Sequence, residues 1–147
     1  HPELIDFPRE GNNWSFKHAC RQWNLRDNGF LKYQWLGDFD AALMKIIGQI
    51  DNPNVHHLTV RQSDHMVSFM HGDFLFVINF SPVARENYYL GVDKKKAYKE
   101  IFNTDDIKYG GSGLLNEGKL TTKKGEVNGR KQYLSLNIPP LAAVVLS

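Results

Sequence analysis

From His56 to the C-terminus the sequence is a succession of short apolar segments separated by turn residues. Val, Ile, Phe and Tyr recur within the segments, whereas Gly, Pro, Asn, Asp and Ser fill the intervals. This is the pattern of β-strands joined by tight turns. We expect strands at residues 57–61, 66–71, 74–80, 87–91, 97–102, 119–124, 131–137 and 141–146. Because no helical pattern separates these seven or eight strands, the sequence predicts a mainly β fold, an antiparallel β-sandwich.

A helix is predicted immediately before the strands. Apolar side chains recur there at helical spacing, at Phe39, Ala42, Leu43, Ile46, Ile47 and Ile50. Asp38 is suited to cap the start of this helix, and Asp51-Asn52-Pro53 to end it. The predicted strand 74–80 is apolar at almost every position, which predicts cover on both faces. We expect the opposing sheet on one face, and the helix or a neighbouring domain on the other.

Composition excludes several classes of partner. The 147 residues carry 18 basic and 16 acidic side chains, a net charge of +2. This balance gives no charge excess for binding nucleic acid or an anionic membrane, and the basic run Lys94-Lys95-Lys96 is interpreted as a solvated turn. No apolar run approaches the roughly 18–20 residues of a membrane span. Cys20 is the only cysteine, so an internal disulfide is excluded and a reducing compartment is favoured.

The best polar constellation in the sequence lies at its start, in His1, Glu3, Asp6, Arg9 and Glu10. Carboxylates and arginine bond sugar hydroxyls, and the aromatic residues between them can stack on sugar rings. The alternative is a surface salt-bridge cluster. His56, His57, His65 and His71 lack the spacing of a metal site, and the loop Gly110-Gly-Ser-Gly113 lacks the residues of a phosphate loop or a nucleophile elbow. We therefore expect no metal and no cofactor.

The first twelve residues, His1-Pro-Glu-Leu-Ile-Asp-Phe-Pro-Arg-Glu-Gly-Asn12, closely resemble the segment after the eighth barrel strand of α-glucan branching enzymes of the α-amylase superfamily. The similarity continues through Trp14-Ser-Phe-Lys-His-Ala-Cys-Arg-Gln-Trp-Asn-Leu25. Phe74–Phe80 and the closing Ala142-Ala-Val-Val-Leu146 resemble strands of the C-terminal β domain of that family. The chain begins at His1 instead of Met, and we expect it to be the C-terminal fragment of a longer polypeptide.

The resemblance implies that residues 1–52 form the end of a (β/α)₈ barrel, its last loop and helix, and that residues 53–147 form the C-terminal all-β domain. It also implies that the catalytic carboxylates lie outside this chain and that the fragment alone is inactive. Because active sites of such barrels lie at the C-terminal face, we expect glucan contacts at the rim residues His1, Glu3, Asp6 and Arg9. The alternative for Asp6 and Arg9 is an ion pair that holds the loop.

The partner implied is an α-glucan such as glycogen, amylose or amylopectin, and the location implied is the cytoplasm, or the plastid if the source is a plant. A second hypothesis is a non-catalytic carbohydrate-binding β-sandwich module with Tyr88, Tyr89 and Tyr98 as its aromatic platform. A third is an interaction domain without affinity for sugars. We also expect some self-association of the isolated fragment, because it leaves apolar surface uncovered.

Overall fold

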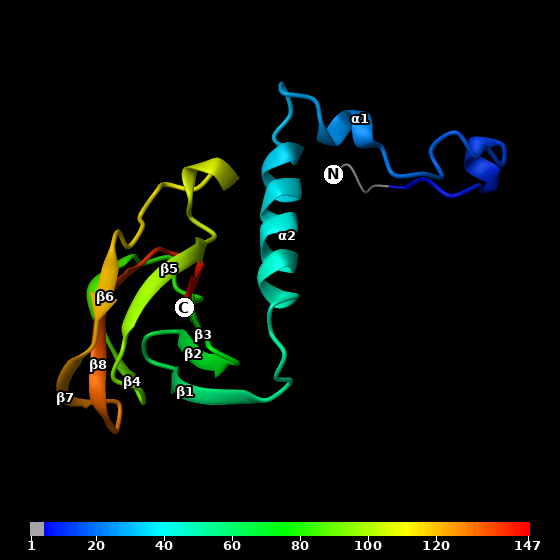
Figure 1. The fold of residues 1–147 in the computed structure, drawn as a ribbon. Helices are drawn as coiled ribbons and strands as arrows, with labels where there is room; N and C mark the ends of the chain where they lie inside the picture. Colours follow the sequence, from blue (N-terminus) through cyan, green and yellow to red (C-terminus); the bar gives the residue numbers. More distant parts are fainter. Residues whose placement is uncertain (1–4) are drawn as a thin grey trace. The chain divides into compact units, whose positions relative to one another are not determined.

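A computed structural model describes residues 5–147, and the chain divides into two compact units, His1–Ala41 and Ala42–Ser147 (Figure 1). The boundary between the units falls inside the longest helix, so each unit is described by itself. The expected division of the parent enzyme at residues 52 and 53 stays a prediction. In residues 5–147, no helix has the length and hydropathy needed to cross a membrane.

The first unit contains a 3₁₀ turn at Glu10–Asn12, a short helix α1 (Trp23–Arg26) and the start of α2 (Tyr33–Ile47). Helix α2 begins earlier than the apolar stripe predicted. Asp38 therefore lies inside the helix, where its Oδ1 accepts a hydrogen bond from Arg26 Nη2 at 2.8 Å, and does not cap the start. A Cβ on Gly37 would lie 2.6 Å from Arg26 Nε, so the absence of a side chain there leaves room for this pairing.

The second unit confirms the predicted mainly β fold, with nine strands in two antiparallel sheets. The strands are β1 (Val55–Arg61), β2 (Met66–His71), β3 (Phe74–Asn79), β4 (Arg85–Val92), β5 (Ala97–Asn103), β6 (Lys119–Thr121), β7 (Lys123–Val127), β8 (Arg130–Ile138) and β9 (Ala143–Leu146). One sheet has the order β1-β2-β3-β9-β5-β6, and the other has the order β4-β8-β7. Strands β1 and β4 are thus both edge strands.

The ninth strand arises where the sequence predicted one strand over residues 119–124. The chain changes sheets at Thr122: β6 pairs with β5 in the larger sheet, and β7 pairs with β8 in the smaller. Thr122 itself is buried, and its N–H donates to the carbonyl of Lys96 at 3.2 Å. The less exposed positions are Leu120 and Thr122 up to the crossing and Gly125 and Val127 after it, so the alternation changes phase where the chain changes sheets.

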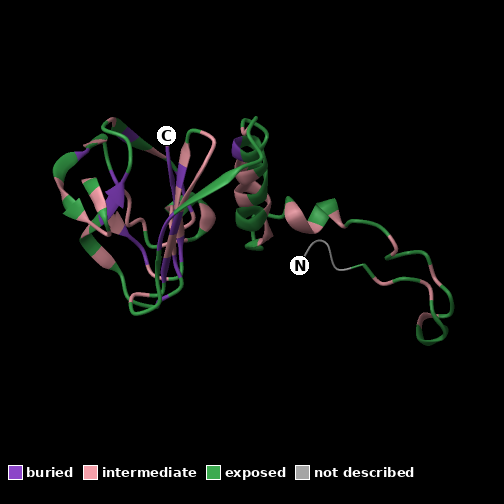
Figure 2. Cartoon of the chain, turned by 90° about the horizontal axis from the view of Figure 1, so that it is seen from below, coloured by how far each residue is buried: buried purple, intermediate pink, exposed green. Residues whose placement is uncertain are grey.

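The core lies between the two sheets, where buried side chains from both gather (Figure 2). Strand β3 alternates: Leu75 and Val77 are fully buried, whereas Phe76 on the opposite face is only half-buried. For this strand, the expected cover is confirmed for the face in the core and stays a prediction for the opposite face. Its outer face is covered in part by its own neighbours, because Phe76 stacks on Phe69 of β2 with ring centroids 5.1 Å apart and an interplanar angle of 6°.

Asn79 ends β3 and fixes the approach to β4. It is buried, and its Nδ2 donates to the carbonyls of Val83 and Pro139 at 2.9 and 2.8 Å, while its Oδ1 accepts from the N–H of Ser81 at 2.9 Å. Every hydrogen-bonding group of this amide is directed at backbone, so it is satisfied despite its burial. The loop that delivers β4 is consequently held to the end of β8.

Candidate functional site

Two regions hold the residues that could carry function: the loop at residues 5–18 and a hollow on the β unit. In the loop, Arg9 Nε donates to Asp6 Oδ1 at 3.0 Å, and both side chains are exposed enough to meet solvent. The structure therefore brings these two predicted contact residues together as an ion pair. The other two, His1 and Glu3, lie outside the described residues.

Asn12 organises this loop, a role that the sequence analysis did not assign to it. Its Oδ1 accepts from the N–H groups of Arg9 and Ser15 at 2.9 and 3.3 Å. Its Nδ2 donates to Asp6 Oδ2 and to the carbonyl of Phe7, both at 3.1 Å. These hydrogen bonds close a compact turn around one amide, in the manner by which Asn shapes local backbone.

The charge on Asp6 is stabilised within this turn. The hydrogen bonds from Asn12 and then from Arg9 hold the pKa of the Asp6 carboxyl below its ordinary value. Three aromatic residues of the same loop, Phe7, Trp14 and Phe16, are exposed at 68%, 67% and 78%. An ionised carboxylate and a guanidinium beside exposed rings can bond sugar hydroxyls and stack on sugar faces, although both charged groups also satisfy one another.

The four histidines between residues 56 and 71 lie in separate surroundings. His56 Nε2 lies 2.9 Å from Asp93 Oδ2, the rings of His57 and His71 lie against Phe69 and Phe76, and His65 occupies a turn with a φ of 54°. Within the described part of the chain, no group of three or more His, Cys, Asp or Glu side chains could hold a metal ion.

The Gly110–Gly113 loop is ordered by a neighbouring carboxylate. Asp105 accepts hydrogen bonds from Ser112 Oγ at 2.6 Å, from the N–H of Ser112 at 2.9 Å and from the N–H of Leu114 at 3.0 Å. The Ser112 hydroxyl is thus one of three donors to a carboxylate that orders the loop.

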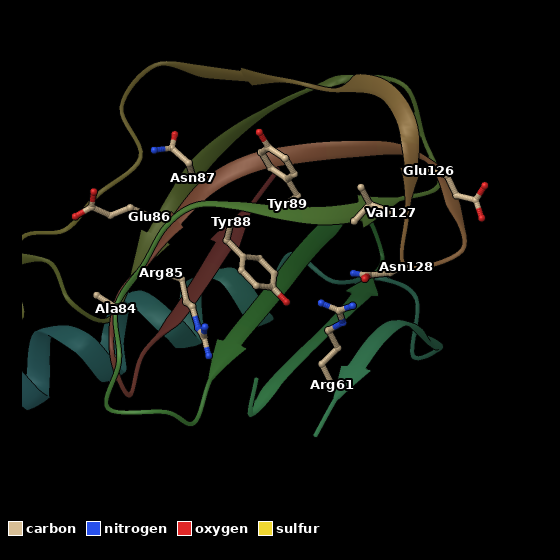
Figure 3. Close-up of a pocket in the computed structure, with 10 residues that line it drawn as sticks. All are labelled: Arg61, Ala84, Arg85, Glu86, Asn87, Tyr88, Tyr89, Glu126, Val127 and Asn128. Atoms are coloured by element: carbon tan, nitrogen blue, oxygen red, sulfur yellow. The ribbon is translucent and has the colours of Figure 1, made fainter. Parts of the chain in front are cut away.

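The hollow lies on the β unit, beside the edge strand β4, and has a volume of about 680 Å³ (Figure 3). It is lined by Arg61 of β1, by Ala84, Arg85, Glu86, Asn87, Tyr88 and Tyr89 at the start of β4, and by Glu126, Val127 and Asn128 at the β7–β8 turn. Figure 3 shows Tyr88 and Arg61 directed toward one another, whereas Asn87 and Tyr89 project from the other side of β4.

A β-bulge shapes this part of β4. Arg85 pairs with Ile138 and Tyr88 pairs with Leu136, so β4 has one residue more than β8 in this stretch. Asn87 adopts a φ of 51°, and its N–H donates to Asn137 Oδ1 at 3.1 Å. Such bulges bend a strand and re-aim its side chains. Beyond the bulge, β4 is paired regularly with β8, and its alternation places the neighbouring Tyr88 and Tyr89 on opposite faces of the strand.

The predicted tyrosine platform is only partly present. Tyr89 is exposed at 54% and lies 5.0 Å, between ring centroids, from Tyr133. Tyr88 is half-buried, and its hydroxyl donates to Asp64 Oδ2 at 2.9 Å. Tyr98 is exposed at only 1%, so its place in the platform was wrong. The alternation of β5 directs Tyr98 into the core, between the exposed Ala97 and Lys99.

Residues 59–147 match the family model described as alpha amylase, C-terminal all-beta domain. The chain belongs to this family. It is also 36% identical to the 1,4-alpha-glucan-branching enzyme of Emericella nidulans, 36% to that of Candida glabrata and 34% to that of Saccharomyces cerevisiae. Each alignment covers 100% of this chain and 22% of the relative, so the chain spans about a fifth of the length of these enzymes.

These matches confirm the resemblance to branching enzymes that the first twelve residues indicated. The matched family is a C-terminal all-β domain and not a catalytic barrel. All the lining of the hollow falls within the α-amylase C-terminal domain, whereas the loop that contains Asp6, Arg9 and Asn12 precedes it. The alignments with the branching enzymes extend over both regions.

Proposed function

We propose that this chain is the C-terminal, non-catalytic part of a 1,4-α-glucan branching enzyme. The observation that carries the proposal is the full-length match of the chain to enzymes of that name, at a fifth of their length. The parent enzyme would cleave an α-1,4 chain and transfer it to a 6-hydroxyl of glycogen, amylose or amylopectin. A double displacement of this kind needs two carboxylates about 5–5.5 Å apart in a rigid site, and we assign these to the part of the enzyme outside this chain.

The β unit has the properties of a structural partner for that enzyme. Its core is closed by side chains from both sheets, with Leu75, Val77, Leu134 and Val144 fully buried. A domain that folds around its own core can stabilise a neighbour without taking part in its chemistry. The cytoplasmic location expected from the sequence belongs to the same proposal and is supported by the single cysteine.

The loop at residues 5–18 is proposed as a glucan-contacting rim. The support is the juxtaposition of the ionised Asp6 and the exposed Arg9 with exposed rings at Phe7 and Trp14. His1 and Glu3 are included from the resemblance alone. In this proposal the Asp6–Arg9 pair has two roles, since it holds the turn and presents its remaining donors and lone pairs to hydroxyls.

Branching activity on amylose tests the proposal in three samples: the 147-residue chain, the complete polypeptide that contains it, and that polypeptide ended at residue 54. Branching shortens the linear runs that bind iodine, so the absorbance of the amylose–iodine complex falls. We expect activity in the complete polypeptide and none in the chain alone, with loss of activity or thermal stability on truncation. Branching by the isolated chain, or a fully active and stable truncation, would contradict the proposal.

Self-association of the isolated chain is part of the proposal as well. Phe30 is exposed at 99%, Phe16 at 78% and Trp23 at 57%, all within residues 5–41. Large exposed rings close together in sequence favour association in water. Sedimentation velocity over a wide range of concentrations should show a growing oligomer fraction, and a monomer at every concentration would refute this part.

A further inference from the structure

We infer that the hollow beside β4 is a second glucan-binding site, separate from the loop at residues 5–18, that takes a short α-1,4-linked run of glucose units. This inference rests on the proposed function for the identity of the sugar. The site itself is argued from the side chains that line the hollow and from the shape of the strand edge that crosses it.

The charges that line the hollow are balanced. Arg61, Arg85, Glu86 and Glu126 are among the lining residues, so the lining carries two charges of each sign. A balanced lining gives no net attraction to a polyanion or a polycation. Guanidinium groups donate, carboxylates accept, and the amides of Asn87 and Asn128 do both. Hydroxyl groups also donate and accept, and they fit such a mixed set better than a ligand of one charge or one polarity does.

Three side chains that line the hollow, Arg61, Tyr88 and Asn128, are each held in place by a hydrogen bond. Asp64 accepts from Tyr88 Oη at 2.9 Å and from Arg61 Nη1 at 3.2 Å. Asn128 Nδ2 donates to Thr59 Oγ1 at 3.3 Å, which anchors the β7–β8 turn to β1. Side chains fixed by neighbours in this way lose little rotamer entropy when a ligand binds. Arg61, with 48% of its side chain exposed, keeps further N–H donors for a ligand.

The aromatic contribution comes from Tyr89. Its ring is half-exposed and is supported by Tyr133 at 5.0 Å, with an angle of 46° between the rings. An exposed ring held by another ring offers a rigid apolar face, which suits the C–H face of a glucose unit. Because Tyr89 and Tyr88 lie on opposite sides of β4, a ligand must bend around the strand edge to reach both. An α-1,4 glucan is intrinsically curved and can do so.

An added peptide strand is the main rival occupant, since β4 is an edge strand with unpaired backbone groups. Two features oppose it. The bulge between Arg85 and Tyr88 interrupts the regular spacing that a ladder of backbone hydrogen bonds requires. Charged side chains at Arg85 and Glu86 are also a common device against edge pairing. The lining therefore favours the sugar.

Binding of maltoheptaose to the 147-residue chain, followed by the backbone amide spectrum in NMR, tests the inference. We expect shifts concentrated at residues 85–89 and 126–128. Tyr89→Ala should weaken binding about tenfold through the loss of ring stacking, whereas Tyr89→Trp should retain it. Phe80→Ala is the matched control, because Phe80 is another exposed ring of the β unit, at 61%, and does not line the hollow.

Any of three results of the sugar titration would overturn the inference: no binding at millimolar maltoheptaose, shifts confined to residues 5–18, or equal weakening by Phe80→Ala and Tyr89→Ala. Concentration-dependent shifts of residues 85–92 without sugar, unaffected by maltoheptaose, would indicate strand addition instead and would also overturn it. The branching assay of the complete polypeptide is independent of these results. Activity there without binding here refutes only the second site, and binding here without activity there refutes only the parent function.

Discussion

The Tyr88 hydroxyl donates a hydrogen bond to Asp64 Oδ2 at 2.9 Å, and this contact joins the two sheets. Tyr88 belongs to β4 of the three-stranded sheet, whereas Asp64 lies in the turn between β1 and β2 of the six-stranded sheet. Arg61 pairs with the same carboxylate at 3.2 Å. The hydrogen bond between Tyr88 and Asp64 therefore fixes a side chain that lines the hollow and also connects the two sheets.

Replacing Tyr88 by Phe should lower the free energy of unfolding by about 1 kcal/mol, because one hydrogen bond to a carboxylate that water can still reach is lost. Urea denaturation of the 147-residue chain measures the change. Tyr89→Phe is the control, since the hydroxyl removed there is on an exposed ring. Equal losses in the two variants would show that the contact with Asp64 contributes nothing.

The same substitution should alter the acid stability of the protein. The hydrogen bond from Tyr88, followed by that from Arg61, holds the pKa of Asp64 below its ordinary value. A carboxyl whose pKa is lower in the folded state contributes stability above its unfolded pKa and loses it as the pH falls through the folded pKa. The difference between Tyr88→Phe and the parent chain should therefore be full at neutral pH and shrink in acid. A difference that grows in acid would contradict this assignment.

Asn116→Asp should destabilise the β unit strongly. Asn116 is buried, and its Nδ2 donates to Glu100 Oε2 at 2.7 Å and to the carbonyl of Asn137 at 2.8 Å. The substitution replaces this donor by an acceptor and sets two carboxyl groups against one another, which we expect to cost about 3 kcal/mol at pH 7. Asn54→Asp, at an exposed position, should leave stability unchanged.

The effect of Asn116→Asp should also depend on pH. Burial raises the pKa of Glu100, so this carboxyl contributes most below the ordinary glutamate pKa and contributes less as the pH rises through its folded value. In Asn116→Asp, the added carboxylate beside Glu100 makes stability fall further as the pH rises, because two adjacent negative charges repel one another. The variant should therefore recover part of its stability between pH 7 and about pH 5. Denaturation curves at the two pH values measure the recovery, and a constant deficit would indicate that the lost hydrogen bonds of Asn116 Nδ2, and not the added charge, cause the destabilisation.

Gly91→Ala should destabilise the packing of β4 against the β7–β8 hairpin. A Cβ at position 91 would lie 2.1 Å from the carbonyl oxygen of Val127, which is backbone and cannot rotate away. We expect a loss of about 2 kcal/mol, the usual cost of overpacking, in the thermal or urea unfolding of the chain. Gly48→Ala is the control, because a Cβ there meets Met44 O at an ordinary 3.4 Å. Unchanged stability of Gly91→Ala would mean that the hairpin shifts freely.

Asn12→Ala should disorder the loop at residues 5–18 more than Glu10→Ala does. The amide of Asn12 holds Asp6, Phe7, Arg9 and Ser15 through four hydrogen bonds, whereas Glu10 is exposed. Amide hydrogen exchange of residues 6–15 should accelerate in the first variant and stay the same in the second. Similar exchange in both would show that the Asp6–Arg9 pair alone orders the turn.

Features that depend on residues close in sequence were predicted, whereas features that depend on distant segments were not. Alternation and turn residues located eight strand segments, and β2 was predicted with its observed bounds, because Met66 to His71 sits between two compact turns. The ion pair of Asp6 and Arg9 was foreseen as one of two alternatives, because the two residues are three apart. The hollow was not foreseen. It needs the bulge in β4 and the approach of Arg61 and Asn128 from distant segments, and nothing local to any of the three indicates it.

The sequence by itself determined the mainly β class, the positions of the strands and, through its first twelve residues, the kinship with branching enzymes. These depend on local propensity, periodicity and a dense motif. Only the tertiary structure decided that β6 and β7 belong to different sheets, that Tyr98 is core while Tyr89 is surface, and that Tyr88 meets Asp64. Those outcomes depend on strand order and register. They are set by how all the strands bury their apolar faces together, and no single segment encodes them.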